Sequence, residues 1–98
     1  MNKQNNTLKI TVTSDDIKNG YQNSCYRCPI ALAISRRLKE LNIWYSMVEV
    51  FKADVYIYKP SDKEIWLLPA KAQYFITQFD TNGIVEPFEF NLVKDNVI

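Results

Sequence analysis

The sequence has no histidine, only two glycines and only two cysteines in its 98 residues. Without histidine the chain lacks the commonest general base and the commonest metal ligand. Gly20 and Gly83 cannot form the glycine-rich loop that holds phosphates in P-loop or dinucleotide-binding sites. The serines have no neighbouring base in the sequence that would activate them as nucleophiles. We therefore expect that the protein is not an enzyme and carries no cofactor.

Long apolar runs and an excess of one charge are also missing. No apolar stretch approaches the roughly 18 residues that a membrane-spanning helix needs, and the polar first seven residues do not resemble a signal peptide. Lysine and arginine number 12 against 11 acidic residues, a net charge of +1, so no overall field draws the protein to nucleic acid or to an anionic membrane. We expect a cytoplasmic protein with reduced cysteines and no membrane partner.

Apolar residues make up 47% of the chain, which is enough for a packed core, and their periodicity predicts the elements. Alternation predicts strands at residues 8–13, 43–51, 54–59, 64–68 and 85–92, whereas spacings of three and four predict helices over 29–41 and 69–79. Ser14 is expected to cap a single helical turn. This order predicts an α+β fold, a single two-layer domain with a mainly antiparallel sheet of about five strands and two main helices on one face. The domain should span residues 8–93, between a disordered tail, 1–7, and a loose end, 94–98.

A C-x-x-C motif, Cys25 and Cys28, stands directly before the longer amphipathic helix. Pro29 suits the first helical position, which places Cys28 at the N-cap. Two thiols at a helix N-terminus are typical of dithiol oxidoreductases, where the thiol pKa is lowered. A thioredoxin-like site, however, follows a core strand, whereas a polar loop precedes this pair. Pro69, at the distance of a cis-proline, is expected to open a helix instead.

Three other interpretations of Cys25 and Cys28 stay open. A structural zinc site needs four ligands, so these thiols would have to be shared across a homodimer. A local disulfide would close a very short loop and add little stability. The simplest interpretation is that one or both thiols pack beneath the helix as small apolar groups. We expect no metal site within one chain.

Aromatic residues make up 13% of the chain and include six tyrosines. Tyrosine, tryptophan and arginine are the usual anchors of protein interfaces. The candidate binding residues are the aromatic residues of the expected sheet and the arginines around the cysteine helix: Trp44, Tyr45, Tyr56, Tyr58, Trp66, Arg27, Arg36 and Arg37. Alternation alone does not decide which of these aromatic side chains point outward. The same set would also serve a nucleotide or nucleic acid, through base stacking and phosphate contacts, although no strand carries a known stacking motif.

Several segments together resemble short proteins encoded by phages and prophages. They are residues 25–34 (CYRCPIALAI), Leu68-Pro69, Phe79-Asp80 and residues 85–90 (VEPFEF), and the pattern extends from Ile10 to about Leu92. That group has no assigned activity, so the resemblance supplies no catalytic or binding residue. It implies a small accessory protein acting in a bacterial cytoplasm. Small non-enzymatic phage proteins often bind and block a host protein or defence component, and we expect a host protein as the partner here.

Overall fold

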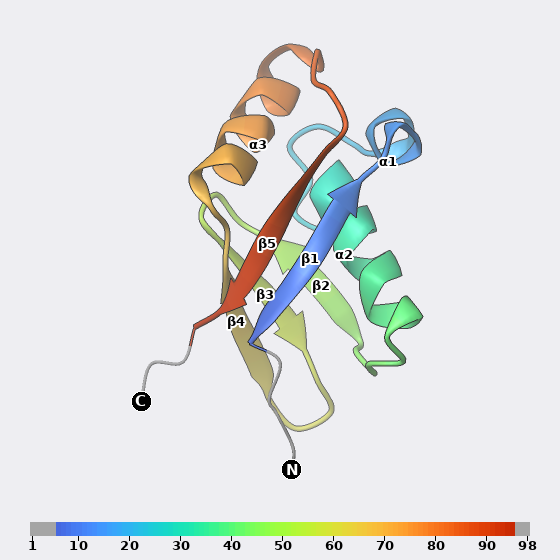
Figure 1. Cartoon of the computed structure of the whole chain (residues 1–98), viewed down its shortest axis with the longest axis vertical. Helices are drawn as coiled ribbons and strands as arrows, with labels where there is room; N and C mark the ends of the chain where they lie inside the picture. The colour runs from blue at the N-terminus through green and yellow to red at the C-terminus, as the bar shows by residue number, and fades with distance from the viewer. Residues whose placement is uncertain (1–5, 96–98) are drawn as a thin grey trace.

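A computed structural model describes residues 6–95 of the chain (Figure 1). Its five strands form one antiparallel sheet in the order β1-β5-β4-β3-β2. The strands are β1 (Thr7–Val12), β2 (Met47–Val50), β3 (Asp54–Tyr58), β4 (Lys63–Leu67) and β5 (Phe88–Lys94), and the helices are α1 (Ser14–Asn19), α2 (Pro29–Glu40) and α3 (Ala70–Asn82). The expected α+β architecture is therefore confirmed. Among residues 6–95, no helix is both long and apolar enough to cross a membrane.

The sheet is curled because β4 and β5 pair over a very short length. Within the described residues, Trp66 pairs with Lys94 and Leu67 with Val93 across these strands, whereas β1 and β5 pair from Thr7 to Val12. The β1–β5 ribbon therefore lies in front of β2, β3 and β4, with α2 behind β1 (Figure 1). Alternate residues of every strand fill the space inside this curl: Leu8, Ile10, Val12, Val48, Val50, Val55, Ile57, Trp66, Phe90 and Leu92.

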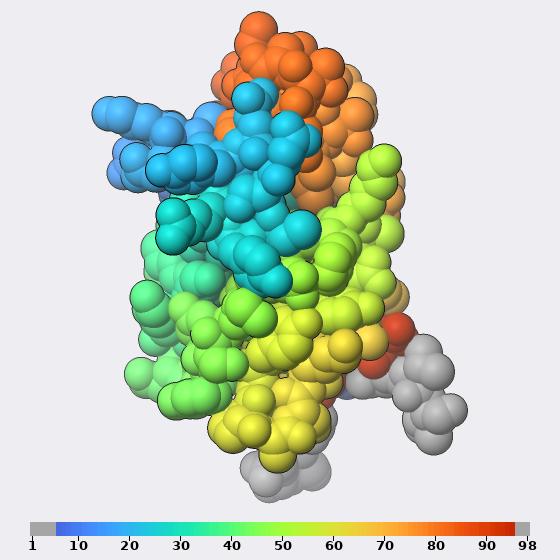
Figure 2. All heavy atoms as spheres, turned by 180° about the vertical axis from the view of Figure 1, so that it is seen from behind, coloured from blue at the N-terminus to red at the C-terminus, as the bar shows by residue number. Residues whose placement is uncertain are grey.

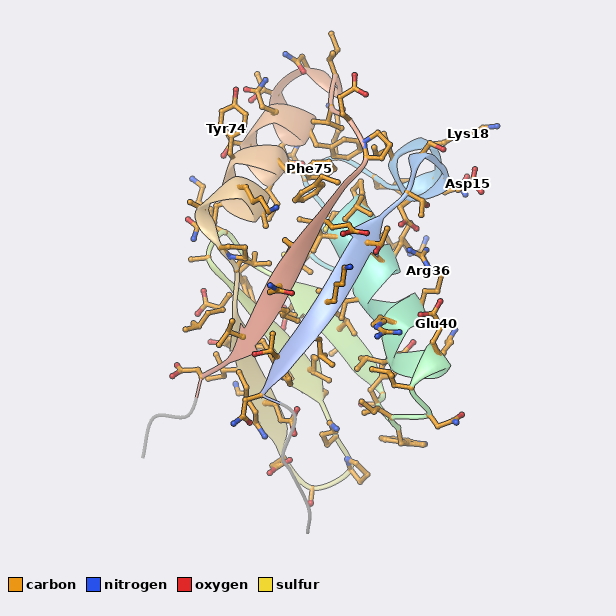
Figure 3. All side chains as sticks on the ribbon, viewed as in Figure 1. Asp15, Lys18, Arg36, Glu40, Tyr74 and Phe75 are labelled. Atoms are coloured by element: carbon orange, nitrogen blue, oxygen red, sulfur yellow. The ribbon has the colours of Figure 1, made fainter. Side chains whose placement is uncertain are left out.

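Both main helices pack on the inner face of the curled sheet. Helix α2 buries Ile30, Ile34 and Leu38 of the stripe that its sequence spacing predicts, whereas Leu41, expected as the last member of the stripe, is the exposed C-cap. From α3, the ring of Phe75 stacks on that of Phe88 with 4.7 Å between centroids, and Phe88 shares its strand face with the buried Phe90. In Figure 3, Phe75 turns towards β5 while its neighbour Tyr74 points away. The two-layer arrangement expected from the sequence is present.

The start of α1 differs by one residue from the expectation. Thr13, not Ser14, is the N-cap, because its side chain and that of Asp16 form a reciprocal capping box. The Thr13 oxygen accepts the Asp16 N–H at 3.2 Å, and the Asp16 carboxylate accepts the Thr13 N–H at 2.9 Å. A cap at Ser14 would place the apolar Ile17 at the third helical position, where no reciprocal bond can form.

The expected strand over residues 43–51 is wrong in its first half, since β2 begins only at Met47. The chain leaves α2 through Asn42, which adopts a left-handed conformation, and the Ile43 N–H donates back to Leu38. Residues 43–46 therefore return the chain from the helix to the sheet. Their alternating pattern reflects one side packed against the core and one side exposed, which need not indicate a strand.

Two prolines mark the other boundary differences. Pro69, the expected first helical residue, is instead the N-cap of α3, so the helix begins at Ala70. Pro87 has no N–H to donate to a ladder, and β5 begins directly after it. Of the expected tails, residues 1–5 and 96–98 lie outside the described residues. Thr7 already belongs to β1, and β5 extends to Lys94.

Candidate functional site

The outer face of β2, β3, β4 and the end of β5 carries three rows of side chains, and none of the helices described within residues 6–95 packs against it. The register places Met47, Tyr58 and Lys63 in one row and Glu49, Tyr56 and Ile65 in the next. A third row holds Asp54, Leu67 and Val93. Figure 2 shows this side of the molecule, with residues 21–28 in cyan above the green and yellow residues of β2, β3 and β4.

Six apolar and aromatic side chains lie on neighbouring strands of this face, with Asp54 and Lys63 among them. We call this set the outer patch and define it as Met47, Phe51, Tyr56, Ile65, Leu67 and Val93. Four of these side chains remain 37–43% exposed, and Tyr56 and Ile65 are half-buried between them. An apolar patch that extends over several strands is unusual on a monomer and is typical of a surface that another molecule covers.

Two tyrosines beside the outer patch are held by one carboxylate. The Tyr58 hydroxyl donates to Glu49 at 2.7 Å, and the Tyr26 hydroxyl donates to the other oxygen of Glu49 at 3.0 Å. The hydrogen bond to the Glu49 carboxylate raises the pKa of Tyr58 to about 12, and the same contact raises the pKa of Tyr26. These phenols therefore stay protonated, and their rings are fixed before any partner arrives.

The ring of Tyr56 is enclosed by two neighbours. Phe51 meets it edge-on with 4.9 Å between centroids, and the Lys63 ammonium lies 4.4 Å above its centroid. Such a cation–π contact orients the lysine across the ring. A planar ligand that stacks on this face of Tyr56 would have to displace Lys63.

The other candidate aromatic residues lie elsewhere. Trp66 is only 4% exposed and belongs to the core, which corrects its expected place among the surface-binding residues. Its indole N–H donates to Glu64 at 3.1 Å. Trp44 is 61% exposed but lies on the connection between α2 and β2, and Tyr45 directs its hydroxyl to the Ser35 carbonyl of α2 at 3.5 Å. Only Tyr56 and Tyr58 share the outer face.

The three candidate arginines do not converge with the tyrosines. Arg36 forms a bidentate ion pair with Asp16 at 2.6 and 2.9 Å and also donates to the Thr11 carbonyl, so it ties α1 and β1 to α2. Burial would raise the pKa of Asp16, but the hydrogen bonds from Arg36 and from the Thr13 N–H outweigh it and hold the pKa below its usual value. Arg27 lies exposed in the turn before α2. Arg36 thus has a structural role.

A depression of about 390 Å³ lies between β1 and α2, and its charged groups already pair with residues of this chain. Arg37 contacts Glu40 at 3.2 Å, and Lys9 contacts Glu89 at 3.3 Å. The Nε of Arg37 is buried without a hydrogen-bond partner among residues 6–95. Figure 3 shows Arg36 and Glu40 along the same edge of α2. A ligand here would have to compete with these ion pairs.

The two cysteines lie together at one end of α2, and both thiols are free. Cys25 is exposed, whereas Cys28 is buried at the N-cap of α2, as its position before Pro29 predicts. Burial raises the pKa of the Cys28 thiol to about 11, so it is not an activated nucleophile. Among residues 6–95 no group of three histidine, cysteine or acidic side chains could hold a metal.

The sequence does not predict most residues of the outer patch. The alternation of its strand places Glu49 on the same face as Tyr56 and Tyr58. Its contact with Tyr58 could therefore be predicted once the strand register was known. Phe51 and Leu67 look like ordinary core residues in the sequence, because apolar side chains occur on both faces of their strands. Nothing in the sequence alone aligns Leu67 with Val93, since 25 residues including α3 separate them.

Comparisons with protein-family models, with curated proteins and with solved structures gave no match.

Proposed function

We propose that the protein is a small non-catalytic binding module that attaches to another protein through the outer patch. In the setting that the phage-protein resemblance implies, the partner is a host protein of the bacterial cytoplasm, such as a defence component, whose activity the module changes. The observation that carries the proposal is the set of exposed apolar side chains on four strands, which no helix among residues 6–95 covers. A surface of this kind gains free energy when a partner removes it from water.

The composition of the patch also supports a protein partner. Tyrosine, phenylalanine and methionine are enriched at the centres of protein interfaces, and lysine and glutamate usually lie at the rim. Here Glu49 lies on the edge strand β2, whereas Asp54 and Lys63 lie among the apolar side chains. Fixed aromatic rings such as Tyr58 lose little side-chain entropy on binding, which favours affinity. We expect the partner to present a mainly apolar contact surface of matching shape.

Nucleic-acid binding is the second candidate, and the geometry supports it less. Two tyrosines on a sheet could stack bases, and Lys63 could contact a phosphate. Glu49 and Asp54 on the same face would repel a phosphate backbone, however, and Lys63 already covers Tyr56. Arg36 is engaged with Asp16 on another side of the molecule. An absorbance ratio of the purified protein at 260 and 280 nm, before and after nuclease treatment, tests this candidate.

The test of protein binding compares three forms of the chain in affinity capture from a bacterial lysate. Leu67→Lys places a charge within the outer patch, opposite Asp54, which can accept it without loss of the strand pairing. Ile84→Lys changes an equally apolar residue that is 76% exposed but lies outside the patch, and it serves as the matched control.

We expect the wild type and Ile84→Lys to retain the same protein in stoichiometric amount, and Leu67→Lys to lose at least about 90% of it, as for an interface hot spot. The proposal is wrong if no protein is retained in stoichiometric amount, or if Leu67→Lys retains it equally well. A concentration-dependent homodimer that Leu67→Lys abolishes, with no other protein bound, would show that the patch serves a second copy of this chain instead.

A further inference from the structure

The C-x-x-C pair is a second feature with its own chemistry, and it does not belong to the outer patch. Cys25 and Cys28 line one pocket of about 300 Å³, which lies between residues 23–28, the end of β2 and α3. The backbone fixes both positions. The Val50 N–H of β2 donates to the Cys25 carbonyl at 2.8 Å, and a turn over residues 25–27 brings the chain directly back to Cys28.

The sulfur of Cys28 is surrounded as a metal-bound thiolate would be. As the N-cap of α2 it accepts the Ala31 N–H at 3.4 Å, and the Ile30 N–H also favours its charged form. Such N–H donors and the positive end of the helix stabilise a thiolate. Cys28 is also almost fully buried, at 6% exposed, so a charge on its sulfur requires a cation beside it.

The number and type of ligands decide which cation fits. Only the two sulfurs are available, because no third histidine, cysteine or acidic ligand completes a cluster among residues 6–95. Zinc requires four ligands and calcium and magnesium require oxygen, so none of these fits one chain. Thiolates select soft ions, and among these Cu(I) is bound by sulfur ligands. Ag(I) has the same charge and preference and binds two sulfurs in a line.

We infer that Cys25 and Cys28 of a single chain chelate one soft monovalent cation, Cu(I) or Ag(I), at the mouth of this pocket. The two thiols release their protons to solvent, two sulfur–metal bonds form, and the ion keeps its charge, so no electron is transferred. The site then carries one net negative charge. Lys52 on the same pocket offsets it, while Asp80 of α3 is engaged by the Asn23 N–H at 2.9 Å. Val50 and Ile76 are apolar residues that line the same pocket.

Serine variants test the site without removing the helix cap. Serine is a preferred N-cap residue, so Cys28→Ser should preserve α2, and Cys25→Ser changes an exposed position. Tyr26→Phe, between the two thiols, is the matched control. Reduced protein is titrated without oxygen with Cu(I), supplied as its acetonitrile complex, against a chromophoric Cu(I) chelator. Native mass spectrometry gives the number of ions per chain.

We expect one ion per chain in the wild type and in Tyr26→Phe. Each serine variant should bind Cu(I) at least about a hundredfold more weakly. Substitution of a residue that only contacts a metal ligand usually causes a smaller loss of affinity. The inference is overturned if either serine variant keeps the wild-type affinity, or if one ion binds per two chains, as a site shared across a dimer requires. It is equally overturned if Zn(II) binds one chain as tightly as Cu(I).

A second measurement holds even if Cys28→Ser does not fold. Cys25 is exposed, so iodoacetamide should alkylate it readily in the wild type. One equivalent of Ag(I) should protect Cys25 from alkylation. The protein concentration is chosen so that a single thiol would lose the ion to added glutathione, whereas two thiols that chelate the ion would keep it. Loss of protection on adding equimolar glutathione would show that only one thiol binds the ion and would contradict the inference.

Discussion

At the scale of single residues, Asp16 shows how the chain accommodates a buried charge. It is the one acidic side chain among residues 6–95 that is almost fully buried, at 4% exposed. Its carboxylate receives the Thr13 N–H and two N–H groups of Arg36, so its oxygens are paired in the folded state. A buried carboxylate that is fully hydrogen-bonded is tolerated, whereas leaving its partner unpaired is costly. Asp16 therefore connects the cap of α1 with α2.

Asp16→Ala should lower the free energy of unfolding by about 2–3 kcal/mol, since it removes the capping box and leaves Arg36 without its partner. Asp15→Ala, one residue earlier, should cost less than about 0.5 kcal/mol, because Asp15 is exposed and only complements the helix dipole (Figure 3). Urea denaturation at neutral pH measures both values. Equal losses in the two variants would contradict the structural role of the ion pair.

The pH dependence of stability gives a second test of Asp16. Its pKa is lowered from 3.8 in the folded state, so its stabilising contribution is complete above that value and is lost as the pH falls through the folded-state pKa. Between about pH 5 and pH 2 the wild type should lose more stability than Asp16→Ala. Parallel losses in the two proteins would show that Asp16 titrates with its ordinary pKa.

Gly20 is required by contact rather than by its dihedral angles, and Gly20→Ala tests this. A Cβ at Gly20 would lie 2.6 Å from the Cδ of Pro29, a rigid ring at the start of α2. We expect a loss of about 1–3 kcal/mol, as for other overpacked sites. Gly83→Ala is the comparison, because its φ of 74° is strained for alanine while its Cβ has room, and it should cost about 1 kcal/mol. A neutral or stabilising Gly20→Ala would contradict the close packing.

At the scale of elements, residues 21–28 are attached at both ends of the loop. The Gln22 side chain donates to the Phe79 carbonyl and the Asn23 N–H donates to Asp80, both on α3. The Tyr26 hydroxyl donates to Glu49 on β2. The loop thereby connects α3 to the edge of the sheet and positions the cysteines before α2. Its polar sequence predicts a loop, but only the folded structure shows that its side chains bind to two separate elements.

Glu49→Gln should release this attachment and lower the pKa of Tyr58 from about 12 towards 10, because the neutral amide no longer disfavours the phenolate. An absorbance titration of the tyrosines measures the change, and Tyr58→Phe identifies the component that moves. Glu89→Gln is the control, since Glu89 contacts Lys9 and Thr11 but no tyrosine. An unchanged titration curve in Glu49→Gln would contradict the shared carboxylate.

Local chemistry explains which elements the sequence could predict. Alternation defines β1, β3 and most of β4, and Cys28-Pro29 with the Ile30, Ile34 and Leu38 stripe defines α2. The strand order and the short β4–β5 pairing depend on contacts between distant segments, which no local pattern encodes. The burial of Trp66 follows from that register. Of the residues that form the candidate site, the sequence therefore predicted only Tyr56 and Tyr58.

At the scale of the whole molecule, the curled sheet divides the apolar residues of the chain between two surfaces. Its inner face packs on α2 and α3 and forms the core. Its outer face keeps Leu67, Val93 and Met47 open to solvent, although burial of these groups would contribute roughly 25 cal/mol per Å². A surface substitution there should leave stability nearly unchanged, within about 0.5 kcal/mol for Leu67→Lys. Thermal unfolding measures this and validates the variant for binding experiments.

Site-specific photo-crosslinking in bacterial cells tests the outer patch most directly. A photoreactive amino acid replaces Ile65 at the centre of the patch in one variant and Lys18 on the exposed side of α1 in the other (Figure 3). We expect position 65 to crosslink one defined protein of another sequence, and position 18 to crosslink none. Crosslinks of equal yield from both positions, no crosslink from position 65, or crosslinks only between copies of this chain would contradict the proposal that the outer patch binds a host protein.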